Sequence, residues 1–451
     1  MLNFNQDEFP TPVSKFEAML KTNEVLFFDA QEFESIVQYY IDYGKINLAE
    51  RAIEIGMNQH PKNGELLLLK SEILIFEGDY KKSLEIIELV EKLIPQNEDV
   101  FLQKASIASK SKQHFEAVKF LNKALELSEE PEEIWGLLGM EFLILEDFNS
   151  AKHYFKLCLN DNLLDYQSLY NLLYAYDQLN DSNGAIETLN SILERDPYCE
   201  VAWHQLGKIY CNQNNYKEAI SAFEFAIISD DKFTGAYIEI GKIFEKIGKI
   251  NLAIENYHIA SQINDPSAYV FYRIANCYSV LGNSDLSIQF YKKSVNIEPT
   301  FEKSWIGIID YYLKNDDLDT TLLNAKQALD SNEGNAVITK KVGDVFFKLN
   351  KFEEAIFYYE SIIELAEYDL CSWTSLIDCL IKQYMLNQAK KTINQALDIY
   401  LNSPDLILRL AIIELKLGKN NSAKKFLGLI EKNTVNKFFE NDLYSSFKDK
   451  I

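Results

Sequence analysis

The 451-residue sequence is poor in the residues that interrupt regular secondary structure, with only 17 glycines and nine prolines. Globular chains normally contain more of both, so this scarcity argues against long disordered stretches and predicts regular secondary structure through most of the chain. Hydrophobic residues make up 47% of the sequence, which is sufficient for a large folded core.

Positive charge is scarce as well. The sequence has 45 Lys and Arg against 68 Asp and Glu, which gives a formal net charge of −23 at pH 7. Nucleic acids and anionic lipid surfaces are polyanions, and a chain this negative repels them unless it concentrates its basic residues in one place. We therefore expect neither nucleic acid nor a membrane as a partner.

Signals for export and membrane insertion are missing too. No apolar run approaches the roughly 18 residues of a membrane-spanning helix, and residues 1–10 lack the basic and apolar regions of a secretory signal. The cysteines form no CxxC pair; they are Cys158, Cys199, Cys211, Cys277, Cys371 and Cys379. Isolated thiols suit a reducing compartment better than a disulfide framework, so we expect a cytoplasmic protein.

Motifs for catalysis are also missing: the sequence has no Gly-rich phosphate loop, no HExxH, no GxSxG and no metal-type Cys/His framework. His204 and Cys211 lie seven residues apart, with Cys199 just before them, which makes a metal site conceivable. Zinc usually takes three or four clustered ligands, so ordinary surface residues are the simpler interpretation. We expect no catalytic residue, no cofactor, no metal and no enzyme activity.

What the sequence does contain is a period of 34 residues. Small residues recur at this spacing without a shift, at Ala49, Ser83, Ala117, Ala151, Ala185, Ala219, Ala253, Ser287, Thr321, Ala355, Ala389 and Ala423. If Ala49 is numbered repeat position 20, twelve repeats cover residues 30–437, about nine tenths of the chain. Such self-similarity is the signature of a repeat architecture.

Each repeat predicts two helices separated by a turn. Apolar residues at offsets of three, four and seven place one stripe on each helix. Repeat position 15 holds residues that tolerate the left-handed conformation ending a helix, namely Gly44, Gly78, Gly248, Gly282, Gly418, Asn180, Asn214 and Asn350. The small residue at position 20 then allows the second helix to approach the first closely.

Residues 200–233 carry the fullest version of the pattern, with Trp203, Leu206, Gly207, Tyr210, Ala219, Phe223 and Ala226. With these residues the chain resembles the tetratricopeptide repeat family. The resemblance implies an all-α fold, an α-solenoid in which antiparallel helix pairs stack into a right-handed superhelix. It also implies a non-catalytic adaptor that holds a peptide or a partner protein in its concave groove.

The two ends of a stack need different sequence, because each repeat buries its apolar faces only against its neighbours. In residues 1–29, Ser14 and Glu17 fit a capping box that opens a short helix with Phe16, Met19 and Leu20 inward. We predict that this segment caps the first repeat.

The C-terminal end has Phe439, Leu443 and Phe447 four residues apart among polar neighbours. This spacing predicts a solvating last helix or tail, and a docking segment for a partner is the alternative. The predicted organisation is therefore an N-terminal capping segment (1–29), twelve repeats (30–437) and a C-terminal helix or tail (438–451).

In the family that the chain resembles, repeat positions 2, 5, 9, 12 and 13 face the concave groove. From the fifth to the eighth repeat these positions hold Tyr170, Tyr174, His204, Lys208, Ile238, Lys242, Lys246, Tyr269 and Tyr272. Aromatic rings and lysines in this mixture suit an extended peptide or an acidic helix. The alternative is that they are ordinary surface residues.

Lysines recur at position 13 of the later repeats, as Lys314, Lys348, Lys382 and Lys416. The first three follow Asp310, Asp344 and Asp378 by four residues. The ladder is either a basic rail for an acidic partner or a set of Asp–Lys pairs within each helix. We favour the pairs, because the aspartates would cancel most of the field of the lysines.

The sequence thus predicts a non-catalytic scaffold that binds a protein or peptide in its concave groove. A nucleic-acid-binding helical repeat protein is the first alternative, which the net charge of −23 disfavours. A regulatory subunit of an enzyme complex is the second. Neither the identity of the partner nor the oligomeric state follows from the sequence.

Overall fold

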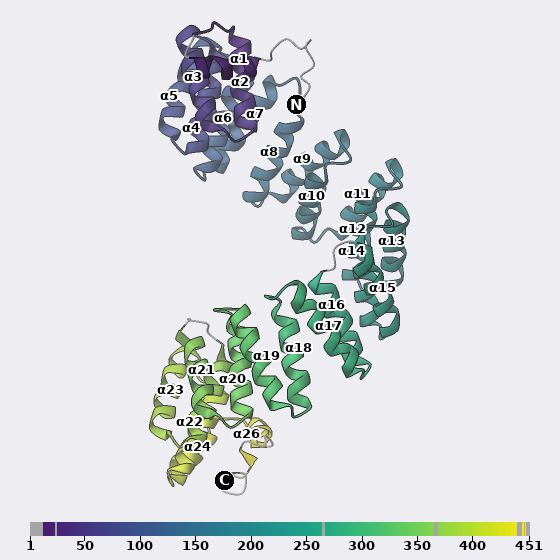
Figure 1. The fold of residues 1–451 in the computed structure, drawn as a ribbon, viewed down its shortest axis with the longest axis vertical. Helices are drawn as coiled ribbons and strands as arrows, with labels where there is room; N and C mark the ends of the chain where they lie inside the picture. Colours follow the sequence, from purple (N-terminus) through teal and green to yellow (C-terminus); the bar gives the residue numbers. More distant parts are fainter. Residues whose placement is uncertain are drawn as a thin grey trace. The chain divides into compact units, whose positions relative to one another are not determined.

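The computed structural model describes residues 12–22, 25–263, 267–364, 369–439, 444–445 and 447. These residues form 26 α-helices and contain no β-strand, and the chain divides into two compact units, residues 1–197 and 198–451. Within each unit, antiparallel helix pairs pack on one another in chain order (Figure 1). The predicted all-α solenoid of stacked helix pairs is confirmed.

The first unit contains one leading helix and five helix pairs. Its helices are α1 (Pro12–Thr22), α2 (Ala30–Asp42), α3 (Ile46–Gln59), α4 (Gly64–Glu77), α5 (Tyr80–Leu93), α6 (Glu98–Lys110), α7 (His114–Leu127), α8 (Glu132–Ile144), α9 (Phe148–Asp161), α10 (Tyr166–Gln178) and α11 (Ser182–Arg195).

The second unit contains seven helix pairs and one terminal helix. Its helices are α12 (Glu200–Asn212), α13 (Tyr216–Ser229), α14 (Thr234–Lys246), α15 (Ile250–Ile263), α16 (Ala268–Val280), α17 (Ser284–Ile297), α18 (Glu302–Lys314), α19 (Leu318–Ser331), α20 (Ala336–Lys348), α21 (Phe352–Glu364), α22 (Leu370–Lys382), α23 (Leu386–Ile399), α24 (Pro404–Lys416), α25 (Asn420–Leu427) and α26 (Lys432–Phe439).

The register read from the small residues matches the helices. The first helix of every repeat begins at the predicted repeat start, from Ala30 in the first repeat to Pro404 in the twelfth. All twelve residues at position 20 are buried, none of them more than 4% exposed. A side chain larger than threonine at this position would separate the two helices of the pair.

The turn between the two helices uses the same backbone geometry in every repeat. The residue at position 15 has a positive φ in all twelve repeats, including the eight glycines and asparagines that the sequence singles out. Lys112, Glu146, Asp316 and Tyr384 hold the remaining four places, with φ between 54° and 60°. The tertiary packing of the pair therefore enforces this turn even where the residue disfavours it.

A glycine at position 8 makes room for an aromatic ring at position 24 of the same repeat. A Cβ atom at Gly207 would lie 2.6 Å from the Phe223 ring, and one at Gly241 would lie 2.6 Å from the Tyr257 ring. Both rings are fully buried. The pair of positions thus fixes how the second helix lies across the first.

Two polar residues occupy positions that are apolar elsewhere, and each has a partner. Ser71, which replaces the glycine at position 8, lies 2.8 Å from the hydroxyl of Ser83. The buried Glu414 accepts a hydrogen bond from Lys390 Nζ at 2.7 Å. Buried polar groups are tolerated when they are paired in this way.

The N-terminal helix α1 packs on the first repeat, where Phe16 meets the rings of Phe28 and Phe33. The predicted capping box was wrong, because α1 begins at Pro12 and Ser14 lies inside the helix. A capping box is present at α2 instead. The backbone N–H of Glu32 donates to Asp29 Oδ1, and the backbone N–H of Asp29 donates to the Glu32 carboxylate.

At the C-terminal end, α26 crosses the predicted end of the repeats at residue 437. Phe439 is buried as a packing residue, and Leu443 lies outside the described residues. The boundaries of the three predicted segments stay predictions.

Ala219→Leu tests the register. Ala219 is fully buried on α13, so the larger side chain should force the helices of the sixth repeat apart and lower the free energy of unfolding by about 1–3 kcal/mol. Urea denaturation followed by circular dichroism measures the change. Ser221→Leu, at an exposed position of the same helix, is the matched control. Equal midpoints for the two variants would contradict the register.

Candidate peptide-binding surfaces

The nine predicted groove residues are divided between the two units. Tyr170 and Tyr174 lie on α10 of the first unit, where they are 46% and 51% exposed. The other seven lie on α12, α14 and α16 of the second unit. Lys208 and Lys246 are exposed there, whereas the remaining residues are partly buried, namely His204, Ile238, Lys242, Tyr269 and Tyr272.

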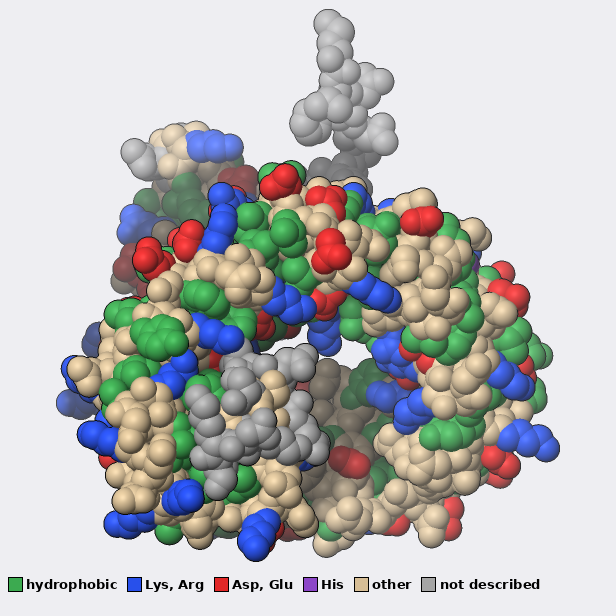
Figure 2. Space-filling model, turned by 90° about the horizontal axis from the view of Figure 1, so that it is seen from below, with side chains coloured by type: hydrophobic (Ala, Val, Ile, Leu, Met, Phe, Trp, Pro, Cys, Tyr) green, Lys and Arg blue, Asp and Glu red, His purple; other side chains and the backbone are tan. Residues whose placement is uncertain are grey.

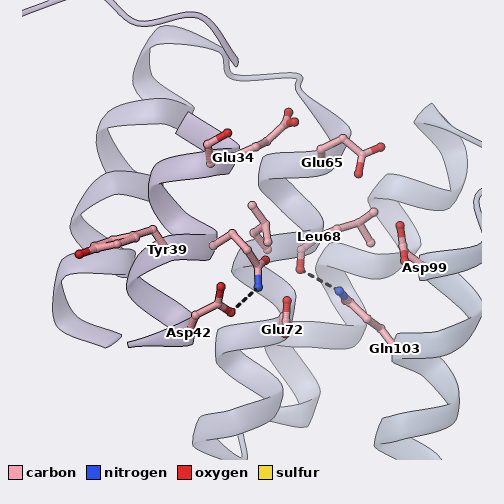
Figure 3. Close-up of a pocket in the computed structure, with 11 residues that line it drawn as sticks. Glu34, Tyr39, Asp42, Glu65, Leu68, Glu72, Asp99 and Gln103 are labelled. Atoms are coloured by element: carbon pink, nitrogen blue, oxygen red, sulfur yellow. Dashed lines mark hydrogen bonds between the residues drawn. The ribbon is translucent and has the colours of Figure 1, made fainter. Parts of the chain in front are cut away.

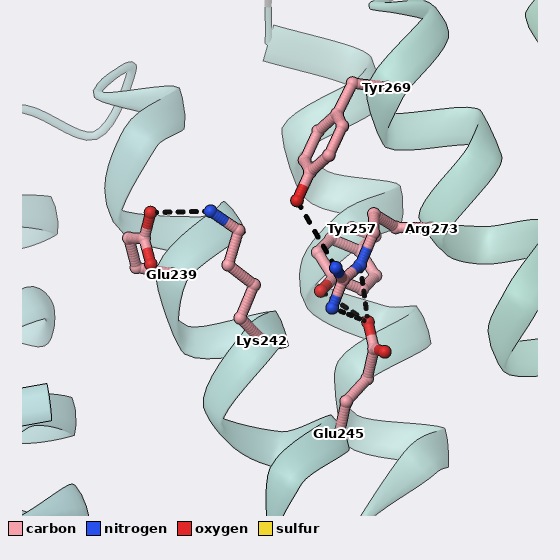
Figure 4. Close-up of polar contacts among 6 residues, drawn as sticks. All are labelled: Glu239, Lys242, Glu245, Tyr257, Tyr269 and Arg273. Atoms are coloured by element: carbon pink, nitrogen blue, oxygen red, sulfur yellow. Dashed lines mark hydrogen bonds and ion pairs between the residues drawn. The ribbon is translucent and has the colours of Figure 1, made fainter. Parts of the chain in front are cut away.

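Lys242 is engaged by its own chain. Its Nζ donates to Glu239 Oε1 at 2.8 Å and lies 5.6 Å from the centre of the Tyr269 ring (Figure 4). Lys246 Nζ lies 5.7 Å from the centre of the Tyr216 ring. These contacts neutralise or screen part of the positive charge that the sequence offers to an acidic ligand.

Arg273 lies in the same cluster as Lys242 and Tyr269. The sequence analysis did not predict it, because repeat position 6 is not one of the groove positions. Its Nε donates to Glu245 Oε1 at 2.9 Å, and its terminal nitrogen lies 3.4 Å from the Tyr269 hydroxyl (Figure 4). The Tyr257 hydroxyl donates to the same Glu245 oxygen at 2.6 Å. Burial, and next this hydrogen bond, raise the pKa of Tyr257 far above its ordinary value, so the phenol stays protonated.

His204 packs between aromatic rings. Its ring centroid lies 5.5 Å from that of Phe223 and 5.1 Å from that of Phe233. Burial, with a smaller effect of the Lys208 charge, lowers the pKa of His204 to about 4, so the imidazole is neutral at pH 7. A neutral, packed imidazole offers no charge to an acidic ligand.

The Asp–Lys pairs predicted within the later helices were wrong. Each aspartate at position 9 instead bonds a residue elsewhere in the array: Asp310 pairs with Lys341 of the next repeat, Asp344 accepts from the Tyr359 hydroxyl and Asp378 pairs with Arg409 of the next repeat. The Asp310 and Asp378 contacts join neighbouring repeats across 31 residues, and the Asp344 contact joins the two helices of one repeat, so the i,i+4 rule applies to none of them.

An open cavity lies in the first unit, and none of the nine predicted groove residues lines it. It measures about 610 Å³ and is lined only by first helices of the first three repeats. Its residues are Glu34, Ser35, Gln38, Tyr39 and Asp42 of α2, Glu65, Leu68, Leu69 and Glu72 of α4, and Asp99 and Gln103 of α6. Figure 3 shows the side chains of the three helices along one face. We call it the acidic cavity.

Five carboxylates line the acidic cavity and no basic residue does. Partial burial raises the pKa of Glu65, and the nearby Asp99 and Glu34 raise it further. Desolvation at the cavity wall likewise raises the pKa of Glu72, with the charges of Asp99 and Asp42 adding to it. Burial first, and then the neighbouring negative charges, disfavour ionisation of these carboxyl groups.

The sequence did contain the signal for this cavity. Asp99 and Glu65 occupy position 2, Glu34 and Leu68 occupy position 5, and Glu72 occupies position 9, which are the family's groove positions. The predicted site was taken from the fifth to the eighth repeat, where these positions hold lysines and aromatic residues. The acidic groove of the first repeats was therefore missed.

Sequence models of the tetratricopeptide repeat family match this chain at six places. They match residues 98–131, 132–160, 166–199, 268–301 and 341–369, and a related model matches residues 202–231. The chain is a tetratricopeptide-repeat protein. Four of these matches begin at repeat starts of the 34-residue register, at Glu98, Glu132, Tyr166 and Ala268.

Solved structures with similar chains include other proteins of this kind. The structure titled MamA is 25% identical over 35% of this chain and 91% of its own, with a TM-score of 0.32. The Cut9–Hcn1 hetero-tetramer of APC/C is 14% identical over 89% of this chain and 92% of its own, with a TM-score of 0.38. YrrB, titled a TPR protein with an unusual peptide-binding site, is 14% identical over 42% and 96%, with a TM-score of 0.33. No curated protein matches the chain.

Other kinds of site have little support in this tetratricopeptide-repeat protein. Within the described residues, no three His, Cys, Asp or Glu side chains lie close enough together to hold a metal ion. None of the described helices has the length and apolar character needed to cross a membrane. Acidic and basic side chains are interspersed over the face shown in Figure 2.

Glu72→Gln tests the electrostatics of the acidic cavity. A raised pKa means that ionised Glu72 destabilises the fold, a cost that is complete at pH 7 and disappears as pH falls below the ordinary carboxylate pKa of about 4. Because the Glu72 side chain is exposed to solvent, we expect the variant to gain only about 0.5 kcal/mol at pH 7.

The gain is measured as a shift of the urea midpoint, and it should shrink toward pH 4. Glu88→Gln, an exposed position of α5 in the same unit, is the matched control and should change stability little. A loss of stability in Glu72→Gln, or an equal gain at both pH values, would contradict this description of the cavity.

Proposed function

We propose that this tetratricopeptide-repeat chain is a non-catalytic scaffold that holds a basic segment of a partner protein in its acidic cavity. The single observation that carries the proposal is the lining of that cavity. Five carboxylates from α2, α4 and α6 surround about 610 Å³ of open space, and no basic side chain shares it. Repeat arrays of this family generally act as binding surfaces without catalysis.

A peptide suits the cavity better than a single cation. The carboxylates are spread over three helices, and no three of the described acidic, His or Cys side chains converge as metal ligands do. Leu68, Leu69 and Tyr39 add apolar and aromatic surface between the charges. Alternating lysine or arginine and apolar side chains on an extended segment would match this arrangement.

The alternatives predicted from sequence fit less well. A nucleic acid would bring phosphates to a surface that is already negative, which the net charge of −23 opposes at longer range as well. A role as regulatory subunit of an enzyme complex is compatible with the scaffold and differs only in the partner. A cytoplasmic location remains part of the proposal, supported by six cysteines that are free thiols.

Binding of a cationic peptide tests the proposal. A labelled nonapeptide of three Lys-Ser-Leu units should bind the full chain, and Glu65→Gln with Glu72→Gln should weaken binding about tenfold. The loss corresponds to two partly exposed ion pairs, about 1.4 kcal/mol together. Fluorescence anisotropy at 50 mM and 200 mM salt measures the affinity, which should fall with salt.

Two controls isolate the cavity. Glu85→Gln with Glu88→Gln makes the same change of charge at exposed positions of α5 in the same unit, and a peptide of three Glu-Ser-Leu units reverses the ligand charge. The α5 variant should bind as the wild type does, and the acidic peptide should not bind. If both double variants lose affinity equally, the attraction is only that of the net charge and the cavity is not the site.

The predicted groove residues give a second test in the same unit. Tyr170→Ala with Tyr174→Ala should reduce recovery of a native partner about tenfold, because these exposed aromatic residues occupy the groove positions 5 and 9 of a first helix. Pull-downs from lysate, compared by mass spectrometry, measure recovery against Phe115→Ala with Phe357→Ala, two exposed aromatics on second helices. Helical content should stay unchanged. Identical partner lists at equal recovery would exclude these tyrosines from the binding surface.

A further inference from the structure

Tyr444 lies beyond the last repeat, yet it is buried, and it contacts the array far back along the chain. Its hydroxyl donates to Asp378 Oδ1 on α22 at 2.5 Å, across 66 residues of sequence. Its ring stacks on Phe438 of α26, with centroids 5.2 Å apart and planes 15° from parallel. An aromatic hydroxyl from the C-terminal segment is thus held by an acid of the eleventh repeat.

Arg409 of α24 also donates to this aspartate. Its Nε and a terminal nitrogen donate to the two oxygens of Asp378 at 2.6 and 2.8 Å, a bidentate pair. Its guanidinium carbon lies 5.6 Å from the centre of the Phe438 ring. The segment therefore presents a phenol to an Asp–Arg pair and a second ring to the arginine.

A third aromatic residue of the segment meets a charged residue of the array. Lys416 Nζ of α24 lies 5.5 Å from the centre of the Phe447 ring and 4.4 Å from that of Tyr384. The described part of the C-terminal segment, residues 432–439, 444–445 and 447, thus contacts α22 and α24 through aromatic rings paired with charges as well as through apolar packing.

The eleventh repeat differs from the tenth in lacking a tyrosine that could donate to its position-9 aspartate, Asp378, from the second helix. In the tenth repeat the equivalent Asp344 accepts a hydrogen bond from Tyr359, the position-24 residue of the same repeat. The eleventh repeat has Ile393 at position 24 and Ile377, not glycine, at position 8. No hydroxyl of its own second helix replaces that of Tyr359, so Asp378 takes its phenol from outside the repeat.

Asp378 and Arg409 occupy the same repeat positions as two residues that line the acidic cavity. Asp378 and Arg409 occupy position 9 of one repeat and position 6 of the next. Glu72 and Gln103 hold the same two positions in the second and third repeats, where they line open space. The exposed face of the first helices is thus open at α2, α4 and α6, whereas the C-terminal segment covers it at α22 and α24.

We propose that the C-terminal segment is an intramolecular ligand that covers a peptide-binding surface on α22 and α24. The external ligand that this surface fits is a peptide with a tyrosine and a second aromatic residue six positions before it. The C-terminal segment competes with such a peptide and must leave the surface before it binds. The inference goes beyond the acidic cavity and does not depend on a basic ligand there.

The test uses the full chain and a labelled synthetic peptide with the sequence of residues 432–451. A tethered segment acts at an effective concentration near millimolar, so it should exclude the free peptide from the wild type. In Phe438→Ala with Tyr444→Ala the tethered segment is weakened, and the peptide should bind at least tenfold more tightly than to the wild type. Fluorescence anisotropy measures both affinities.

A peptide with Phe in place of Tyr444 is the matched control. It keeps the ring and removes only the hydroxyl that Asp378 accepts, so it should bind the double variant at least fivefold more weakly. Equal binding of the peptide by wild type and variant would overturn the proposal. So would equal binding of the two peptides to the variant.

Hydrogen exchange on the wild type can overturn the proposal without a variant, in case the double variant fails to fold. An intramolecular ligand leaves the array while the repeats stay folded, so amides of α26 should exchange at least tenfold faster than those of α22 and α24. Exchange of all three helices at one rate would show that the segment is an integral part of the fold and would overturn the proposal.

Discussion

The close approach of two helices at repeat position 20 is the contact on which the rest of this structure depends. Twelve buried residues no larger than threonine hold it, from Ala49 to Ala423. Because the second helix lies so close, an aromatic ring at position 24 reaches across to position 8, as Phe223 does beneath Gly207. The same approach enforces the left-handed turn at position 15, even on Glu146.

A packing contact that repeats every 34 residues confines the recurring geometry to a few repeat positions and leaves the exposed face of the first helices free to differ between repeats. That freedom explains why the groove positions differ so much along one chain. In the first unit they hold carboxylates around open space, with no basic residue in the lining. In the second unit Glu245, Asp344 and Asp378 occupy similar positions, and each is held by an arginine or a tyrosine of the same chain. These groove carboxylates therefore line an open cavity in the first unit and have internal partners in the second.

The periodic part of this structure could be predicted from the sequence, because one local rule acts twelve times. The starts of all the first helices, from Ala30 to Pro404, follow from the small residues alone. The left-handed turn at Tyr384 could not be read from its residue type, since neighbouring packing imposes it. Contacts between repeats could not be predicted from the sequence either. Arg409 donates to Asp378 across 31 residues, a separation at which no local rule pairs two charges. Tyr444 lies outside the period altogether, so nothing in the register assigned it a partner.

The central claim is that the carboxylates of α2, α4 and α6 form one binding surface for a cationic segment. Zero-length carbodiimide cross-linking of the full chain to the Lys-Ser-Leu nonapeptide tests it most directly, because this reagent joins a lysine only to a carboxylate in contact with it. Mass spectrometric mapping should find the cross-links at Glu65, Glu72 and Asp99, ahead of exposed carboxylates on second helices such as Glu85. Cross-links spread evenly over the acidic residues of the chain would contradict the claim.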